Sequence, residues 1–199
     1  MGDNEIIFRG SVAIVSTLLA AIRLAYGWQA GALRDMLSPR RADKFSAPLL
    51  YFFGLSGAVT SGLYVVAPDW LKWATLRLPS WLRWSGVGLG GLTVGLFFWV
   101  HQALGRNWSM PWVIQADQTL VTSGPYRWVR HPMYSTLLVW ALAYWLMSAN
   151  WLIGAGWFGL GLAAVKTAAA EETALIEKFG EAYQSYRQRT GRFLPRLGR

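Results

Sequence analysis

Residues 133–164 read MYSTLLVWALAYWLMSANWLIGAGWFGLGLAA, two uncharged apolar runs on either side of Ser148-Ala149-Asn150. A helix needs about 20 apolar residues to cross a bilayer core of about 30 Å. Because only this short polar triplet separates the runs, we expect a tight helical hairpin, extending over residues 133–167, rather than one long span. The sequence therefore predicts a pair of antiparallel helices buried in a membrane.

Three further apolar runs precede the hairpin, at residues 6–28, 47–66 and 84–104. Arg9 and Arg23 stand near the ends of the first run, where their long side chains can snorkel to the interface. The third run is rich in glycine, and small residues let helices approach closely in lipid. The fold predicted is all-α: a polytopic integral membrane protein with about five transmembrane helices and a single membrane domain, residues 1–199.

The composition excludes several classes of function. Hydrophobic residues make up 54% of the chain and charged residues 15%, with 13 Trp and a net charge of +9. The basic residues lie between and after apolar runs, so anionic membrane lipids are the expected partner and no nucleic acid is expected. The chain has no cysteine and only His101 and His131 as histidines, which makes a metal site improbable.

The basic residues also predict the orientation, because cytoplasmic loops are enriched in Lys and Arg. Three basic segments fall on one side if the N-terminus lies outside and the C-terminus inside. Their residues are Arg34, Arg40, Arg41 and Lys44, then Arg106, Arg127 and Arg130, and finally Lys178, Arg187, Arg189, Arg192, Arg196 and Arg199. The basic residues Lys72, Arg77 and Arg83 would lie on the outer side, against this rule. The tryptophans of the same loop (Trp70, Trp73, Trp81 and Trp84) predict an interfacial segment.

A dense polar cluster, SGPYRWVRHPMY, occupies residues 123–134 directly before the hairpin. Its Gly-Pro pair favours a turn, and Pro132 suits the first turn of a helix while biasing His131 away from helical geometry. His131 and Tyr134 are therefore expected at a helix mouth, where free backbone N–H groups can meet a ligand. The structural alternative is an interfacial cap whose arginine and histidine meet lipid headgroups.

Glu171-Glu172 form the second polar element, at the start of a predicted amphipathic tail helix over residues 168–189. Neighbouring helical residues point about 100° apart, so one carboxylate can face a pocket while the other faces elsewhere. The alternative is a structural ion pair with Lys166, Lys178 or Arg130 for either carboxylate.

These elements together resemble the isoprenylcysteine carboxyl methyltransferase family, within the wider group of phospholipid-methyltransferase-like membrane proteins. The resemblance covers roughly the last 85 residues and is carried by residues 118–126, Arg130-His131-Pro132-Met133-Tyr134, Glu171-Glu172, Phe179-Gly180-Glu181 and residues 190–195. The Arg-His-Pro-x-Tyr element is shared with phospholipid methyltransferases and membrane sterol reductases, whereas its combination with the tail motifs is more specific.

The resemblance implies S-adenosyl-L-methionine as cofactor, in a site built by residues 105–199, while residues 1–104 supply the N-terminal spans. It implies catalytic roles for His131, Tyr134 and Glu171, with aromatic faces stabilising the sulfonium and a carboxylate accepting from the cofactor's polar groups. The residues implied to line the cofactor are Gln115, Gln118, Thr119, Leu120, Val121, Tyr126, His131, Pro132, Met133, Tyr134, Glu171 and Glu172.

One position departs from the family pattern. Members carry an arginine four residues before the first glutamate, attributed to binding the substrate carboxylate, and this chain has Thr167 there with Lys166 beside it. We expect Lys166, Thr167 and Arg130 to be the substrate-binding positions, although lysine is not equivalent to a bidentate arginine.

The leading hypothesis is an S-adenosylmethionine-dependent methyltransferase of the membrane, acting on a lipophilic small-molecule or lipidated substrate from the cytoplasmic side. Carboxyl O-methylation of an isoprenylcysteine-like group is the first choice, followed by N-methylation of a phospholipid or other lipid amine. A reductase of the sterol type would bind NADPH at the shared histidine–tyrosine region instead. A non-enzymatic scaffold or channel subunit would use the basic segments merely as anchors.

Overall fold

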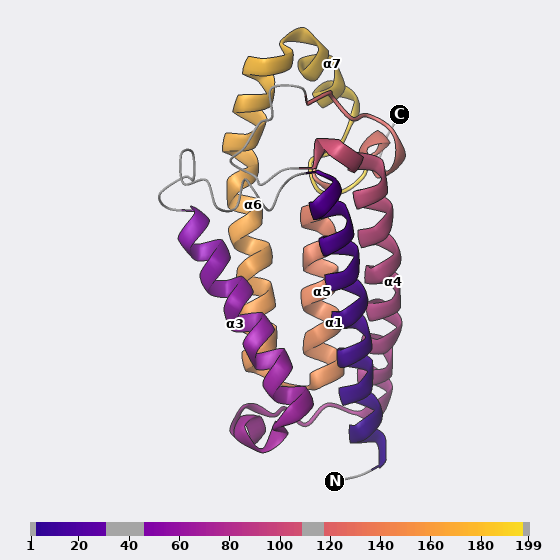
Figure 1. The fold of residues 1–199 in the computed structure, drawn as a ribbon, viewed down its shortest axis with the longest axis vertical. Coiled ribbons are helices and arrows are strands. Elements are labelled where there is room, and N and C mark those ends of the chain that lie inside the picture. The colour runs from indigo at the N-terminus through magenta and orange to yellow at the C-terminus, as the bar shows by residue number, and fades with distance from the viewer. Residues whose placement is uncertain (1–2, 31–45, 109–117, 197–199) are drawn as a thin grey trace.

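The computed structural model describes residues 3–30, 46–108 and 118–196, and every regular element in these ranges is helical (Figure 1). The main helices are α1 (Asp3–Gln29), α3 (Ser46–Val66), α4 (Ser80–Leu104), α5 (Pro132–Ser148), α6 (Trp151–Phe179) and α7 (Glu181–Arg189). Short 3-10 turns, η2 (Pro68–Ala74), η3 (Gly105–Asn107) and η4 (Gly124–Arg127), join them. The all-α prediction is confirmed.

Four of these helices, α1, α3, α4 and α6, are long and apolar enough to cross a membrane. The fifth, α5, has 17 residues, which is at the short end of what a bilayer core requires. It lies inside the bundle against α4 and α6 (Figure 1). The chain therefore has the polytopic architecture expected from its apolar runs.

The turn between α5 and α6 is as tight as the sequence predicts. Ala149 takes a left-handed conformation (φ 46°), and its carbonyl accepts from the Leu76 N–H at 2.6 Å. The Asn150 side chain caps α6 by accepting from the N–H groups of Leu152 and Ile153, at 3.1 and 3.3 Å. Its amide also donates to the Leu71 carbonyl at 3.0 Å. The hairpin prediction is confirmed, and the turn is anchored to η2.

The predicted boundary between hairpin and tail is wrong. No separate helix covers residues 168–189, because α6 continues without a break from Trp151 to Phe179. Residues 168–179 contain good helix formers and neither glycine nor proline. The helix ends at Gly180, which has φ 54°, and α7 begins immediately after it. The long α6 therefore carries Glu171 and Glu172 on the same rigid element as the hairpin.

Glycines set the closest helix contacts. A Cβ built on Gly156 of α6 would lie 2.9 Å from the Gly57 Cα of α3, and one on Gly86 of α4 would lie 2.7 Å from the Leu146 Cβ of α5. Gly90 also packs closely against Val15 and Met147, whereas Gly88, Gly91 and Gly95 of the same helix face open space. The predicted role of glycine in packing thus holds for part of the glycine-rich run.

The two ends of the bundle differ in content. The N-terminus, η2 and the hairpin turn lie at one end, and η4, α7 and the C-terminal tail lie at the other (Figure 1). At the first end Trp70, Trp73, Trp81 and Trp84 are exposed, as an interfacial segment requires. Arg106, Arg127 and Arg130 share the second end with the tail, while the predicted basic segment at 34–44 lies outside the described residues.

A polar cluster joins α1, α3 and α4 at the end that carries the N-terminus. Arg83 donates to Glu5 at 2.7 Å and to the Tyr64 hydroxyl at 2.9 Å, and Tyr64 donates to Glu5 at 2.7 Å. Arg83 also donates to the Met147 carbonyl at the end of α5. From this fixed base α1 and α3 diverge toward the opposite end of the bundle (Figure 1).

Replacing Gly156 by valine should destabilise the purified protein, because the side chain would press into the α3 backbone. We expect a loss of about 2 kcal/mol, seen as a lower midpoint of thermal unfolding in detergent. Gly88→Ala is the matched control, since an added Cβ meets nothing within 4 Å there. Equal midpoints for the two variants would contradict the assigned α3–α6 contact.

Candidate functional site

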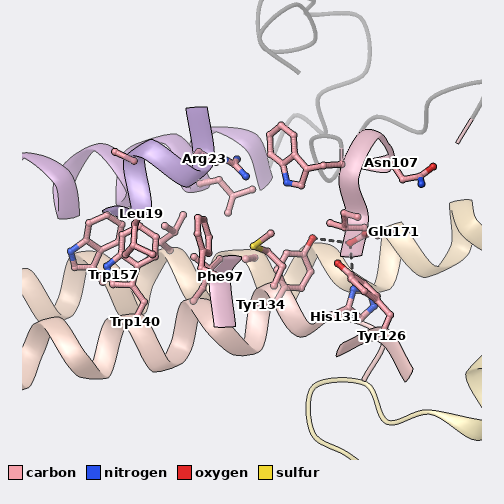
Figure 2. A pocket seen from close by; sticks show the side chains of 18 of the residues that line it. Leu19, Arg23, Phe97, Asn107, Tyr126, His131, Tyr134, Trp140, Trp157 and Glu171 are labelled. Carbon is pink, nitrogen blue, oxygen red and sulfur yellow. Dashed lines mark hydrogen bonds and ion pairs between the residues drawn. The ribbon is translucent and has the colours of Figure 1, made fainter. Parts of the chain in front are cut away.

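A cavity of about 770 Å³ runs along the bundle from the tail toward the middle of the helices. One part of it is apolar, with Leu19, Phe97, Trp140 and Trp157 among its walls (Figure 2). The other part carries the polar side chains of the predicted motifs, including Tyr126, His131, Tyr134 and Glu171. The cavity is therefore amphipathic along its length.

The N-terminal mouth of α5 forms one wall of the polar part. Pro132 begins the helix, and the carbonyl of the non-helical His131 accepts from the Tyr134 and Ser135 N–H groups at 3.1 and 3.3 Å. The His131 and Tyr134 rings lie nearly parallel, at 4° with centroids 5.3 Å apart. Both side chains are almost fully buried and line the cavity, as the sequence predicts for a helix mouth.

The C-terminal tail holds this mouth in place through backbone hydrogen bonds. The Arg130 N–H donates to the Gly191 carbonyl at 2.9 Å, and the His131 N–H donates to the Arg192 carbonyl at 3.0 Å. On α7, the Tyr186 hydroxyl donates to the Tyr126 carbonyl at 2.7 Å. The polar cluster at residues 123–134 and the C-terminal tail, far apart in sequence, thus form one unit.

Glu172 is a buried carboxylate in contact with three basic side chains, forming hydrogen bonds with Arg130 and His131 and an ion pair with Arg192. Its Oε1 lies 3.1 Å from Arg130 Nε, 3.1 Å from His131 Nε2 and 3.3 Å from Arg192 Nε. The carboxylate side chain is 9% exposed and that of Arg130 is 10% exposed. Of the two alternatives for this residue, the structure selects the ion pair, with Arg130 as one of the expected partners.

Glu171 points the other way and lines the cavity (Figure 2). Its Oε2 accepts from the Tyr134 hydroxyl at 2.7 Å and lies 3.5 Å from His131 Nδ1. The Tyr134 hydroxyl is also 3.2 Å from Thr167 Oγ1. The adjacent glutamates therefore divide into one that builds the site and one that faces into it.

The carboxylates also determine the charge of the histidine. Burial lowers the pKa of His131, but hydrogen bonds with Glu171 and Glu172 and the charges of these carboxylates outweigh it, so the net shift is upward. The pKa of the Tyr126 phenol is also raised, by burial first and then by the charge of Glu171. These shifts favour the protonated form of His131 and the neutral phenol of Tyr126.

Three buried polar atoms of residues in the cavity wall lack hydrogen-bond partners among the described residues: Gln118 Oε1, Trp140 Nε1 and the Tyr183 hydroxyl. Unpaired buried polar atoms are costly and rare. Asn107, also in the wall, is held by its Oδ1, which accepts from the Thr119 N–H at 2.7 Å. A polar ligand that contacts Gln118 and Tyr183 would remove this cost, so the donor set fits a bound small molecule with several polar groups.

The structure gathers most of the predicted cofactor residues around this cavity. Those in its wall are Gln118, Thr119, Leu120, Val121, Tyr126, His131, Met133, Tyr134 and Glu171. Pro132 and Glu172 are buried but do not line the cavity, and Gln115 lies outside the described residues. Of the predicted substrate positions, Arg130 lines the cavity, Thr167 reaches it only through Tyr134, and Lys166 is exposed away from it.

Sequence reasoning missed the contribution of the N-terminal helices. Arg23 was expected to snorkel to the interface, yet it lines the cavity with its guanidinium carbon 3.9 Å from the centre of the Trp108 ring. The cavity-facing residues of α1 include Ser16, Leu19 and Ala20. Their spacing with Arg23 follows one face of a helix, and this periodicity was the available signal.

Comparison with known proteins separates the N-terminal helices from the rest of the chain. Residues 89–177 match the isoprenylcysteine carboxyl methyltransferase (ICMT) family. The predicted resemblance to this family is confirmed, although the match begins at residue 89 and ends before the tail motifs at 179–181 and 190–195. Human protein-S-isoprenylcysteine O-methyltransferase is 36% identical over 78 residues, which is 39% of this chain and 28% of the human protein. The Schizosaccharomyces pombe enzyme of that name is 33% identical over 81 residues, 40% of this chain and 34% of the relative.

The likeness in fold extends further than the likeness in sequence. A solved structure described as the eukaryotic intramembrane Ras methyltransferase ICMT, without a monobody, superposes with a TM-score of 0.59 at 19% identity. The superposition covers 98% of this chain and 68% of the solved one. The matched segment spans about a third of the length of the curated ICMT relatives. The family match thus covers α5 and most of α4 and α6, with lining residues from both the polar and the apolar part of the cavity, and the similarity in fold also includes the N-terminal helices.

Glu172→Gln should unfold more readily than the unaltered protein, because Arg130 would remain buried without its carboxylate. Breaking such a pair costs about 3 kcal/mol, measurable as a lower unfolding midpoint in detergent. Glu177→Gln, at an exposed position of the same helix, is the control. An unchanged unfolding midpoint for Glu172→Gln would show that the contacts of Glu172 with Arg130, His131 and Arg192 do not stabilise the fold.

The stability should fall as the pH rises above neutral. Folding raises the pKa of His131, so protonation favours the folded state; this contribution is complete below about pH 6.5 and is lost as the pH passes the folded pKa. Unfolding midpoints measured from pH 6 to pH 9 should decline, and His131→Asn should decline less steeply. Parallel profiles for the two proteins would argue against a charged His131 in the cluster.

Proposed function

We propose that this protein is an integral-membrane methyltransferase that uses S-adenosylmethionine to methylate a lipophilic acceptor. The observation that carries the proposal is the amphipathic cavity, whose polar part consists of motifs matching the ICMT family. The names of the curated relatives support methyl transfer to a carboxyl group. The preferred reaction is therefore carboxyl O-methylation of an isoprenylcysteine-like acceptor.

The polar part of the cavity would hold the cofactor. Glu171 would accept hydrogen bonds from its amino or ribose hydroxyl groups, and the orphaned Gln118 oxygen and Tyr183 hydroxyl would pair with its remaining polar atoms. The rings of Tyr126 and Tyr134 offer faces to a sulfonium. When bound, S-adenosylmethionine supplies an electrophilic methyl group, and the protein needs no nucleophile of its own.

The role of the surrounding residues is to orient and to exclude water. Glu171 accepts from the Tyr134 hydroxyl and, with His131, fixes the wall at the mouth of α5. The tail covers this mouth through the Glu172 cluster and the backbone pairs at Gly191 and Arg192. Alignment of donor and acceptor in such an enclosed site provides most of what a methyl transfer requires.

The apolar part of the cavity would receive the acceptor's hydrocarbon portion. Its walls come from α1, α3, α4, α5 and α6, with Leu19, Phe97, Trp157 and Leu160 among them. A site between membrane helices gives a lipophilic acceptor access without passage through water. The excess of basic residues at the same end of the bundle as the tail supports a cytoplasmic site, with the N-terminus outside.

Binding of S-adenosylmethionine to the detergent-solubilised protein tests the proposal directly. We expect saturable binding, competition by S-adenosylhomocysteine, and no binding of NADPH, which a reductase would require. Glu171→Gln should weaken the affinity about tenfold, since a charged hydrogen-bond partner is worth roughly 1.5 kcal/mol or more. Glu177→Gln, exposed on the same helix, should bind normally. Absence of S-adenosylmethionine binding by the unaltered protein would refute the proposal.

A further inference from the structure

Arg23 is a charged side chain in the cavity wall, at the junction between its apolar and its polar part. It lies on α1, packs its guanidinium over the Trp108 ring at 3.9 Å, and lines the cavity. Within the described residues it forms no ion pair or hydrogen bond with a carboxylate or carbonyl. A cation inside a membrane helix is costly unless it is paired or used.

The other cations of the cavity wall are already engaged. Arg130 gives its Nε to Glu172 and its Nη1 to the carbonyls of Arg187 and Thr190. His131 lies between Glu171 and Glu172. Among the described lining residues, Arg23 is thus the cation left to meet an anionic ligand.

The position of Arg23 in the cavity indicates what kind of anionic ligand it could bind. Figure 2 shows it between the apolar side chains of Trp157, Trp140 and Phe97 and the polar group around Glu171 and His131. A molecule with its hydrocarbon chain in the apolar part would carry its polar end to this junction. The negative Glu171 would repel an anion placed further along, whereas Arg23 would attract it.

We propose that Arg23 binds the carboxylate of the lipophilic acceptor; the inference rests on the methyltransferase function proposed above. On α6, Thr167 is hydrogen-bonded to Tyr134, and Lys166 is exposed away from the cavity. A guanidinium from α1 would supply the charge that α6 lacks. Its planar fork matches a carboxylate and stacks on an aromatic ring, as it does here on Trp108.

The charge balance of the reaction agrees with such a residue. The carboxylate oxygen forms the new bond to the methyl carbon as the sulfur–methyl bond breaks, and the electron pair of that bond stays on sulfur. The product is a neutral ester and the cofactor becomes a neutral thioether. Because the ester no longer attracts the guanidinium, Arg23 would favour the substrate over the product and assist release into the membrane.

The test compares a lipophilic acid with its neutral analogue. Binding of N-acetyl-S-farnesylcysteine and of its carboxamide is measured by titration of the detergent-solubilised protein and of Arg23→Gln and Arg23→Lys. Arg23→Gln should weaken the acid about tenfold and leave the carboxamide within about twofold, with Arg23→Lys in between. Arg106→Gln removes an exposed charge near the same end of the bundle and should change neither ligand.

Several outcomes would overturn the inference. Equal weakening of acid and carboxamide would make Arg23 a packing residue, and an unchanged acid affinity would exclude it from the carboxylate site. Loss of S-adenosylmethionine affinity in Arg23→Gln, with acceptor binding intact, would assign the arginine to the cofactor. Should the variants not fold, equal affinity of the unaltered protein for acid and carboxamide would refute a carboxylate site. Failure of the methyltransferase proposal itself is distinct, because the unaltered protein would then not bind S-adenosylmethionine.

Discussion

The buried carboxylate of Glu172 is the interaction on which the arrangement of the site depends. It receives Arg130 and His131 from the mouth of α5 and Arg192 from the tail, all within 3.3 Å. A carboxylate so deeply buried requires this much compensation, and only the folded tail can deliver it. With the tail attached, the His131 ring is fixed between two glutamates, and Tyr134 and Glu171 are directed into the cavity.

The cavity itself results from unequal helix spacing. Glycine contacts bring α3 against α6 and α4 against α5, while the Glu5–Tyr64–Arg83 cluster ties α1 to α3 near the N-terminus. Toward the tail α1 and α3 diverge (Figure 1), and residues of both helices line the cavity together with residues of the hairpin. Close packing at one end and along one side thus leaves an apolar cavity that leads to the polar motifs.

Glu171 and Arg23 carry opposite charges in the cavity wall and come from different parts of the chain. Glu171 lies among residues that match the ICMT family, within residues 89–177. Arg23 lies on α1, outside that matched segment, in a region where the likeness to the solved ICMT structure is one of fold. Under the proposed function, Glu171 in the matched segment binds the methyl donor, and α1, through Arg23, contributes to the specificity for the acceptor.

The sequence by itself determined the features that depend on neighbouring residues. The lengths of the apolar runs predicted the membrane spans, and the triplet ending at Asn150 predicted the hairpin turn. Pro132 predicted where the helix after His131 begins. Each of these features is a local steric or solvation effect. The sequence also brought most of the polar lining residues together through their motifs. The boundary at residue 168 failed because amphipathic patterning cannot show where a continuous helix leaves the membrane.

Only the tertiary structure decided which side chains meet across the bundle. Glu171 and Glu172 are adjacent and chemically identical, and their different roles follow from cations more than 40 residues away in the case of Arg130 and His131. Arg23 has the sequence setting of a snorkelling residue, yet the divergence of α1 from α3 and its stacking on Trp108 direct it into the cavity. Such pairings depend on how helices cross, a property of the whole packed bundle that no local pattern encodes.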